Sequence, residues 1–364
     1  MTKIGADPFQ NYKTKVENTL LVVYGDNSIH YLHSMPKKDY GYDKRIDQNL
    51  KKDVLAFIDE YLTWFSSEEY PDRTKQIEKI DSLRTVGQDL FDRLIPGNLK
   101  KEILRWNQKT KLCISSNNDW IPWEILHDGS DYLGNRFFIY RLPRVNGNED
   151  EREKEKLTTV PTSWNKSQES SLKKLIHVIG GNLDGFEDGA NRFFTDLNEG
   201  GKIVLHTIEK KGFSVLKENA IEADIIHFTC HGRKDRNFFL QITECSDDPA
   251  LMNLSLLSFA RSDFVIREGC LIFANACSSA AAISCFEEFS SFGSKFINMG
   301  AGYFIGTLGG VPIHYAIEFS NCFYNNLIIN NDISRSFETT KLSMDKKRNQ
   351  FHLLYVIYGN PAIH

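Results

Sequence analysis

The sequence predicts an α/β fold whose larger part is an open, mostly parallel sheet flanked by helices. Three observations support this prediction. Six short, mostly apolar runs recur after residue 173, and helical or loop stretches separate most of them. These runs are apolar on both faces, which is typical of parallel strands covered by helices on each side. A preceding stretch has strands and amphipathic helices of its own, which indicates a smaller α+β half.

Length and composition restrict the class of protein. With 364 residues, 41% hydrophobic and 25% charged, the chain suits a soluble protein of one large or two ordinary domains. A formal net charge of −4 gives no bulk indication of nucleic-acid or membrane binding. The N-terminus has no continuous apolar run, so we expect a cytoplasmic protein without a secretion signal. Seven cysteines without a CxxC pair argue against zinc, and we expect no metal and no cofactor.

Residues 1–145 are expected to form the smaller α+β half. The stretch 18–35 predicts two strands around a Gly-Asp-Asn turn. Apolar residues at helical spacing predict helices near 50–65 and 77–94. Three further short strands are expected in "KLCISSN", "WIPWEILHDG" and "FFIYRLP". Residues 146–173 are polar and charge-dense, which predicts a linker or long loop.

Residues 174–364 are expected to form the main α/β domain. One uncharged segment there, residues 296–317, is long enough to span a bilayer. Its clustered glycines and Pro312 indicate instead a buried strand, a turn and the start of a helix. The predicted strands of this domain lie in "KLIHVIGGN", "KIVLHTIE", "ADIIHFTCHG", "CLIFANACSS", "GAGYFIGTL" and "LLYVIYG".

A histidine and a cysteine follow two of these strands at their carboxyl ends, where functional groups collect in open α/β sheets. His231 ends one run and Cys277 ends the next. Cys230 precedes His231 directly, but neighbours on a strand point to opposite faces, so Cys230 should face away from it. The other cysteines lie at a strand start, in helical patterns, in a polar loop or in the smaller half: Cys270, Cys285 with Cys322, Cys245, and Cys113. We therefore expect His231 and Cys277 to form a pair.

This pair suits nucleophilic catalysis on a peptide. A thiolate attacks the carbonyl carbon, and an imidazole activates the thiol or protonates the leaving amine. The backbone amides of Gly232 and Cys277 are placed to hold the oxyanion. Positive charge from Arg233, Lys234 and Arg236 would favour a thiolate, although a solvated loop explains these residues equally well. Taken singly, a strand histidine and a buried cysteine also have purely structural interpretations.

Five motifs in order resemble a known family. "HFTCHG", followed 46 residues later by "FANACSS", is similar to the His-Gly and Ala-Cys motifs of caspase-like cysteine proteases, whose histidine precedes the cysteine by about 50 residues. With "WIPWEILHDG", "MGAGYFIGTLGGVP" and "VIYGNP", the chain most resembles CHAT-domain proteases, relatives of caspases and separases. The resemblance covers roughly residues 75–364. It implies a caspase-like catalytic domain with a His231–Cys277 dyad, and a smaller half that resembles an inactive caspase-like half.

The resemblance also implies a substrate pocket. Asn275, two residues before the nucleophile, would help line it. Asp184 or Asp188, in the loop after the first strand of the main domain, would add negative charge, or are ordinary turn residues. The backbone near Leu308 and Gly309 would pair with an extended substrate, as an added strand does.

The implied function is a cysteine endopeptidase that cleaves a specific protein partner and stays latent until a partner or ligand activates it. Similar CHAT proteases occur in bacterial antiviral defence, so a gasdermin or another defence effector is an expected substrate. No direct contact with nucleic acid or membrane is expected. One alternative is a catalytically silent caspase-fold scaffold for protein binding. Another is a phosphate or nucleotide binder using "GGNLDG", which matches neither the GxGxxG nor the P-loop pattern.

Overall fold

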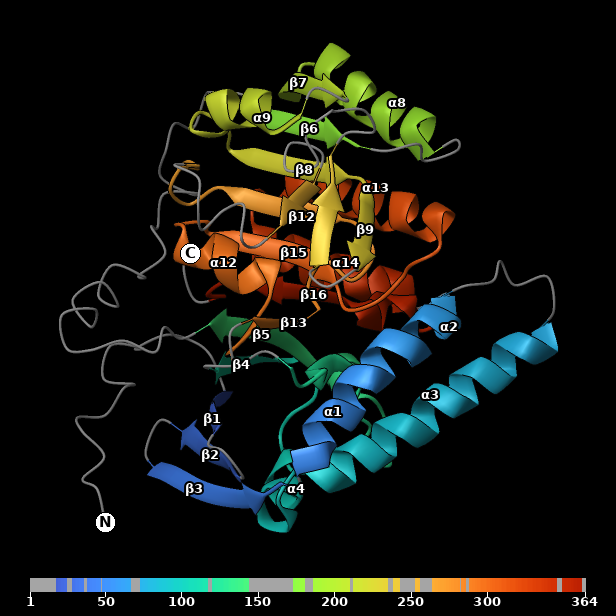
Figure 1. The fold of residues 1–364 in the computed structure, drawn as a ribbon, viewed down its shortest axis with the longest axis vertical. Coiled ribbons are helices and arrows are strands. Elements are labelled where there is room, and N and C mark those ends of the chain that lie inside the picture. Colours follow the sequence, from blue (N-terminus) through green and yellow to red (C-terminus); the bar gives the residue numbers. More distant parts are fainter. Residues whose placement is uncertain are drawn as a thin grey trace.

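One large sheet runs through the whole molecule (Figure 1). Its eleven strands follow the order β3-β2-β1-β4-β5-β16-β15-β12-β8-β6-β7, so strands of both parts of the chain belong to it. Most of the predicted linker 146–173 lies outside the described residues. The computed structural model describes residues 18–24, 28–35, 38–46, 48–66, 73–116, 120–143, 173–180, 186–209, 212–234, 238–242, 253–255, 264–281, 283–285, 288–345 and 349–361.

The N-terminal strands form a meander that joins a parallel segment. The first three pair antiparallel, which confirms the hairpin predicted for residues 18–35. The first strand also pairs parallel with the fourth, and the fourth with the fifth. The bounds are β1 (Asn18–Tyr24), β2 (Ser28–Met35), β3 (Lys38–Arg45), β4 (Thr110–Ser116) and β5 (Phe137–Pro143).

The helices of this half cover the sheet beside β4 and β5 (Figure 1). Both predicted helices are confirmed, and the first contains a π-helical turn, η1. Leu50, Val54 and Phe65, three of the apolar residues at helical spacing, are buried, as that spacing predicts. The bounds are α1 (Gln48–Ala56), η1 (Phe57–Tyr61), α2 (Leu62–Ser66), α3 (Arg73–Leu94) and α4 (Gly97–Ile103).

The strand predicted in "WIPWEILHDG" is wrong. This stretch forms a 3-10 turn, η2 (Trp123–Ile125), and then a loop that leads to the short helix α5 (Leu133–Arg136). Pro122 precedes the turn and removes a donor that a strand ladder would need. His127 donates its N–H to the Gly87 carbonyl of α3 at 3.0 Å, so the loop is tied to the long helix rather than to a strand.

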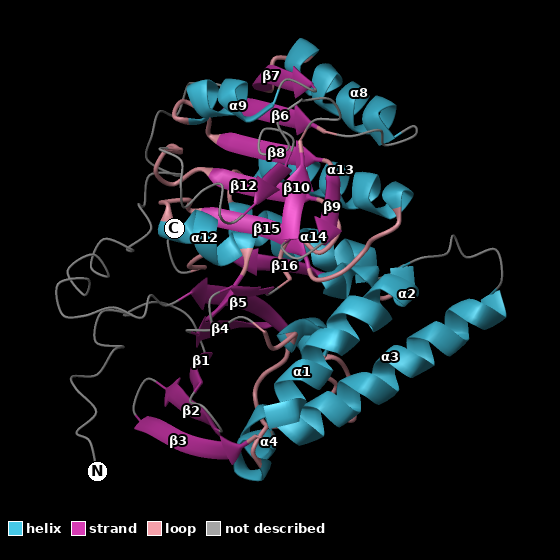
Figure 2. Cartoon of the chain, in the orientation of Figure 1, coloured by secondary structure: helices cyan, strands magenta, loops and turns pink. Residues whose placement is uncertain are grey.

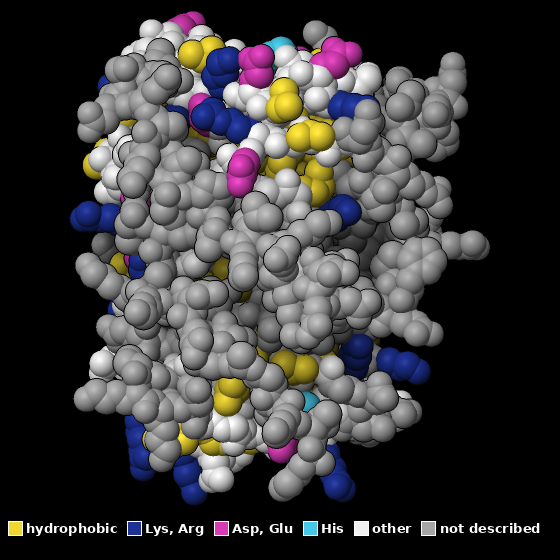
Figure 3. All heavy atoms as spheres, turned by 90° about the vertical axis from the view of Figure 1, so that its left-hand side faces the viewer, with side chains coloured by type: hydrophobic (Ala, Val, Ile, Leu, Met, Phe, Trp, Pro, Cys, Tyr) yellow, Lys and Arg dark blue, Asp and Glu magenta, His cyan; other side chains and the backbone are white. Residues whose placement is uncertain are grey.

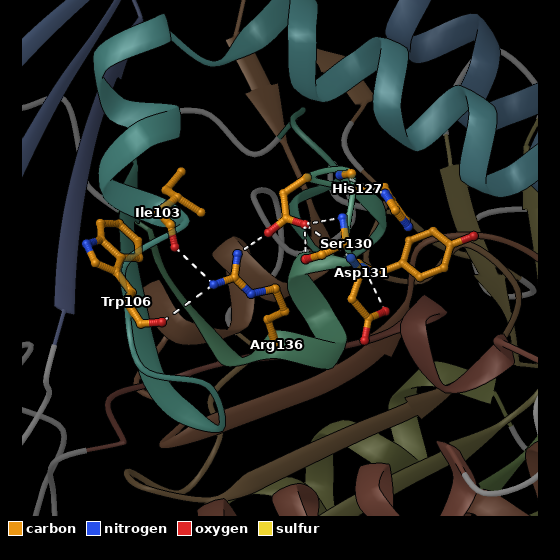
Figure 4. A network of polar contacts seen from close by, with 9 residues as sticks. Ile103, Trp106, His127, Ser130, Asp131 and Arg136 are labelled. Carbon is orange, nitrogen blue, oxygen red and sulfur yellow. Dashed lines mark hydrogen bonds and ion pairs between the residues drawn. The ribbon is translucent and has the colours of Figure 1, made fainter.

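A polar network fixes the loop that follows (Figure 4). The Asp128 carboxylate accepts hydrogen bonds from the Ser130 N–H and hydroxyl and from the Asp131 N–H. Arg136 forms a buried ion pair with Asp128 and donates to the Ile103 carbonyl at 3.1 Å. A buried ion pair loses solvation, and here further hydrogen bonds compensate it. This motif therefore joins α4, η2 and α5 and supplies no group to the site described below.

The six predicted strands of the main domain are all confirmed, as is the mostly parallel sheet. The pairs β6–β7, β6–β8, β8–β12 and β12–β15 are parallel. The last strand, β16, pairs antiparallel with β15 and parallel with β5, and so joins the two parts of the chain. The bounds are β6 (Lys173–Ile179), β7 (Ile203–Glu209), β8 (Ile225–Thr229), β12 (Leu271–Asn275), β15 (Tyr303–Thr307) and β16 (Tyr355–Tyr358).

Helices cover both faces of this part of the sheet (Figure 2). His227 packs against Phe194 of α8 and Tyr324 of α13, whereas its neighbour Phe228 packs against Phe296 of α12. Because adjacent strand residues point to opposite faces, α8 and α13 lie on one face and α12 on the other. The bounds are α8 (Phe186–Glu199), α9 (Gly212–Ala220), α12 (Phe292–Asn298), α13 (Ile313–Asn330), α14 (Ile333–Asp345) and the 3-10 turn η4 (Phe351–Leu354).

Short strands complete the fold. A three-stranded sheet of β9 (His231–Lys234), β10 (Phe238–Gln241) and β11 (Asn253–Ser255) follows β8. The hairpin of β13 (Ile283–Cys285) and β14 (Glu288–Ser290) corrects the helical pattern expected around Cys285, whereas Cys322 lies in α13 as expected.

The segment 296–317 forms the end of α12, strand β15 and the start of α13, as predicted. Within the described ranges, no helix combines the length and the apolar character that crossing a bilayer requires. At the upper end of the face in Figure 3, basic and acidic side chains occur together. Lys174 and Glu222, for example, form an ion pair at 2.8 Å. This mixture agrees with the low net charge of the sequence.

Candidate active site

The register of two parallel strands brings His231 and Cys277 to the same edge of the sheet. Thr229, the last residue of β8, is the partner of Asn275, the last residue of β12. The chain continues for two residues beyond each strand, to His231 and to Cys277. Because the strands are adjacent, parallel and in register, these two residues leave the sheet side by side at its carboxyl edge.

The two cysteines near this edge differ in exposure. Cys230 is buried, and this burial raises the pKa of its thiol, with a further contribution from nearby Cys277. Cys277 is exposed. Cys230 directly follows β8, whose Phe228 packs against Phe296 of α12. Cys277 is therefore the thiol of this pair that a substrate can reach.

The residue after Cys277 adopts an unusual conformation. Ser278 has a φ of 56°, in the left-handed region that non-glycine residues seldom occupy. Its N–H donates to the Gly309 carbonyl at 3.0 Å, and the Ala280 N–H donates to the Thr307 carbonyl at 2.8 Å. Such a conformation persists only where the surrounding structure enforces it, and here the segment after β15 does so. We call residues 276–280, which contain the candidate nucleophile Cys277, the nucleophile turn.

Two hydroxyl groups hold the same turn from inside. The Ser279 hydroxyl donates to the Ala274 carbonyl at 2.8 Å and accepts the Thr307 N–H at 3.0 Å. The Thr307 hydroxyl donates to the Ala276 carbonyl at 2.8 Å. Sequence reasoning assigned no role to Thr307. A threonine at the end of the apolar run "YFIGT" was the available signal.

His231 begins a second sheet. It lies two residues after the end of β8 and is the first residue of β9. In the pairing of β9 with β10, His231 lies opposite Gln241 and Gly232 lies opposite Leu240. The histidine is half-buried. The solvated loop expected after it is a strand, since Arg233 and Lys234 belong to β9. Arg236 lies outside the described residues.

Asn275, the last residue of β12 and two residues before Cys277, is buried. Its side-chain amide donates to the Ala316 carbonyl of α13 at 3.1 Å, and its oxygen accepts a hydrogen bond from the Tyr355 hydroxyl at 2.9 Å. On the neighbouring strand, the Thr229 hydroxyl is 2.9 Å from Nε2 of His177. Burial lowers the pKa of His177 to about 3, so this imidazole is neutral near pH 7.

The other predicted pocket residues are distributed as follows. Leu308 is buried and donates its N–H to the Leu354 carbonyl at 2.9 Å. Gly309 accepts the Ser278 hydrogen bond and lies against Leu62 of α2. Asp188 lies in α8, and its side chain is outside the described part. Asp184 lies outside the described residues. Within the described ranges, no cluster of three or more His, Cys, Asp or Glu residues is arranged to hold a metal ion.

Comparison with known proteins identifies a family and solved structures with a similar fold. The CHAT domain model matches residues 84–356. Two crystal structures of the Saccharomyces cerevisiae separase–securin complex match with TM-scores of 0.58 and 0.56, at 12% and 11% identity. Each match covers 94% of this chain and 30% of the other chain, so this chain spans less than a third of that length. No curated protein matches. At such low identity, the likeness to the separase complex shows a shared fold.

Proposed function

Because this chain belongs to the CHAT domain family, we propose that it is a cysteine endopeptidase with His231 and Cys277 as its catalytic dyad. The observation that supports the proposal best is the register of β8 and β12, which carries both residues to one edge of the sheet. The exposure of Cys277 supports it further, since the buried Cys230 cannot serve as the nucleophile.

The reaction follows from the chemistry of the two groups. His231 takes the thiol proton, and the Cys277 sulfur attacks the carbonyl carbon of the scissile peptide. The backbone N–H groups of Gly232 and Cys277 stabilise the resulting oxyanion. His231 then gives its proton to the departing amine, and a thioester remains on Cys277. Water, deprotonated by His231, hydrolyses the thioester and regenerates the thiol.

One observation supports the oxyanion assignment. Among the described residues, the Cys277 N–H has no hydrogen-bond acceptor, whereas the next N–H groups of the turn donate to carbonyls. A donor of this kind is available to a charge that develops during the reaction.

The substrate pocket is proposed around Asn275, Leu308 and Gly309, with Asp184 and Asp188 as acidic residues of its wall. Two observations support this pocket. Asn275 lies two residues before Cys277 in the sequence, and Gly309, which follows Leu308, accepts a hydrogen bond from the N–H of Ser278. Asn275 already uses its amide and its oxygen within the protein, so it contributes to the pocket floor rather than as a free hydrogen-bonding group.

The two parts of the chain are proposed to have different roles within the shared sheet. Residues 174–364 carry the dyad, and residues 1–145 regulate it, so that the enzyme is latent until an activating partner or ligand binds. We propose a specific protein substrate, a gasdermin or another effector of bacterial antiviral defence. This last step rests on the family alone. It requires that phage protection by the intact locus is lost in the Cys277→Ala strain.

The dyad is tested with the full-length protein and three single variants. The chain is co-expressed with candidate protein substrates encoded beside it, and new protein termini are read by mass spectrometry. We expect a discrete cut that is absent with Cys277→Ala and His231→Ala and remains with Cys230→Ala, the matched control. A cut that persists with Cys277→Ala would refute the assignment. A biological output that is equal in all variants, without any cut, would favour the silent scaffold.

A further inference from the structure

We propose that Leu62, in the N-terminal half of the chain, is a positioning residue for the nucleophile turn and acts on it through Gly309. This inference rests on the proposed function, because it gives the N-terminal half a physical route to Cys277. It names a contact between parts of the chain that are about 250 residues apart in sequence.

The contact itself is close. A Cβ atom built on Gly309 would lie 2.6 Å from Cβ of Leu62 and 3.3 Å from its Cδ1. Real carbon atoms do not approach to 2.6 Å, so glycine is the residue that fits here. Gly309 is not among the described glycines with a positive φ, so its conformation alone would admit alanine. The close approach of the Leu62 side chain is therefore the reason that only glycine fits at position 309. Leu62 is fully buried in this position.

Gly309 is also hydrogen-bonded to the nucleophile turn. Its carbonyl accepts the N–H of Ser278, the left-handed residue next to Cys277. Two residues earlier, Thr307 binds the same turn through its hydroxyl and its carbonyl. The segment 307–309 thus has the nucleophile turn on one side and Leu62 on the other. Since protein interiors are close-packed, a displacement of Leu62 shifts this segment and the hydrogen bonds that it makes.

The position of Leu62 depends on the π-helical turn before it. Leu62 is the first residue of α2 and directly follows η1, Phe57–Tyr61. A π-helical turn contains one more residue than an α-helical turn, and each α-helical residue rotates the side chain by about 100°. A regular α-helix over residues 57–61 would turn Leu62 away from Gly309. The π turn therefore orients the Leu62 side chain toward residues 307–309.

A direct readout of the turn does not need a substrate. The Ser278 and Ala280 N–H groups are hydrogen-bonded to residues 307–309, so their hydrogen exchange reports how firmly the turn is held. The variants are Leu62→Ala, Leu62→Met, Gly309→Ala and the exchange variant Leu62→Gly/Gly309→Ala. Leu90→Ala is the matched control, because Leu90 is equally buried in α3 and is not among the atoms nearest to Gly309.

We expect exchange in residues 276–281 to be at least about fivefold faster with Leu62→Ala and with Gly309→Ala than in the wild type. Leu62→Met and Leu90→Ala should stay within about twofold of the wild type, because methionine fills similar volume and Leu90 lies elsewhere. The exchange variant should be slower than Gly309→Ala, since its new methyl group enters the space that Leu62 has vacated. Equal acceleration by Leu62→Ala and Leu90→Ala, or no recovery in the exchange variant, would overturn the proposal.

The rate of Cys277 alkylation by iodoacetamide, read peptide by peptide, separates this proposal from the proposed dyad. If the dyad exists, His231→Ala lowers the rate at pH 7, and Leu62→Ala lowers it toward the same value while Leu90→Ala does not. If His231→Ala alkylates as fast as the wild type, the dyad is wrong, and the exchange data still decide the role of Leu62. A third outcome is an alkylation rate that falls with His231→Ala and changes by the same factor with Leu62→Ala and Leu90→Ala. That result would support the dyad and refute the positioning role of Leu62.

Discussion

Removing the hydroxyl group of Tyr355 should loosen the end of β12, the strand that precedes Cys277. Tyr355→Phe deletes the hydrogen bond that the Asn275 side-chain oxygen accepts at 2.9 Å. The ring itself stays stacked on Phe319, with centroids 3.7 Å apart, so the substitution leaves little new space. Its main effect is a buried amide oxygen without this donor. Such a group costs about 1–3 kcal/mol, and we expect the free energy of unfolding to fall by that amount.

Denaturant unfolding of the full-length protein measures this loss, with Tyr132→Phe as the control. The Tyr132 hydroxyl reaches the Ile80 carbonyl at 3.4 Å, a long contact to a helix carbonyl, so its loss should cost less than about 1 kcal/mol. The substitutions remove the same atom from two buried rings. If Tyr355→Phe costs no more than Tyr132→Phe, the Tyr355–Asn275 hydrogen bond does not stabilise the end of β12.

Three further predictions follow from buried groups. Glu124→Ala leaves the Arg141 guanidinium buried without its carboxylate and should cost about 3–5 kcal/mol in denaturant unfolding, whereas loss below about 1 kcal/mol would mean that the pair is solvated. Because the folded pKa of His177, about 3, lies below its unfolded value near 6.5, its contribution to stability is complete above pH 6.5 and is lost as the pH falls toward 3. The free energy of unfolding should therefore fall by up to about 1.4 kcal/mol per pH unit in this window, and a His177→Asn variant with an unchanged slope would exclude this histidine as a cause. Gly293→Ala places a methyl group 2.5 Å from an aromatic ring and should lower the melting temperature, while Gly41→Ala, with nothing within 4 Å, should leave it unchanged.

The strand ends that carry the candidate dyad could be predicted because apolar runs are a local signal. Each run is buried on both faces, and His231 and Cys277 each lie two residues beyond the end of the strand. The wrong strand in "WIPWEILHDG" has an equally local cause. Its large apolar residues favour strands, but Pro122 and the carboxylate of Asp128 favour a turn, and the turn chemistry prevailed.

The contacts that hold the site could not be predicted in the same way. The hydrogen bond from the Thr307 N–H to the Ser279 hydroxyl forms because β15 pairs with β12. The periodicity of a strand does not indicate which other strand it will pair with. The contact of Leu62 with Gly309 depends on a π-helical turn, which the helical spacing of residues 50–65 does not reveal. Such contacts depend on how distant segments pack, whereas periodicity reports which face of one segment is buried.

The position of β16 between β5 and β15 affects how the sheet can assemble during synthesis. Ile357 pairs with Tyr140 on one side and with Ile305 on the other, so this strand closes the gap between two sheet segments synthesised long before it. On the ribosome, β5 and β15 keep open edges until residues 355–358 have emerged, and open edges invite pairing with other chains. A chain interrupted before residue 355 would also lack Tyr355 and with it the hydrogen bond to Asn275. The hydrogen bond that supports the end of β12, two residues before Cys277, can therefore form only after residues 355–358 have been synthesised.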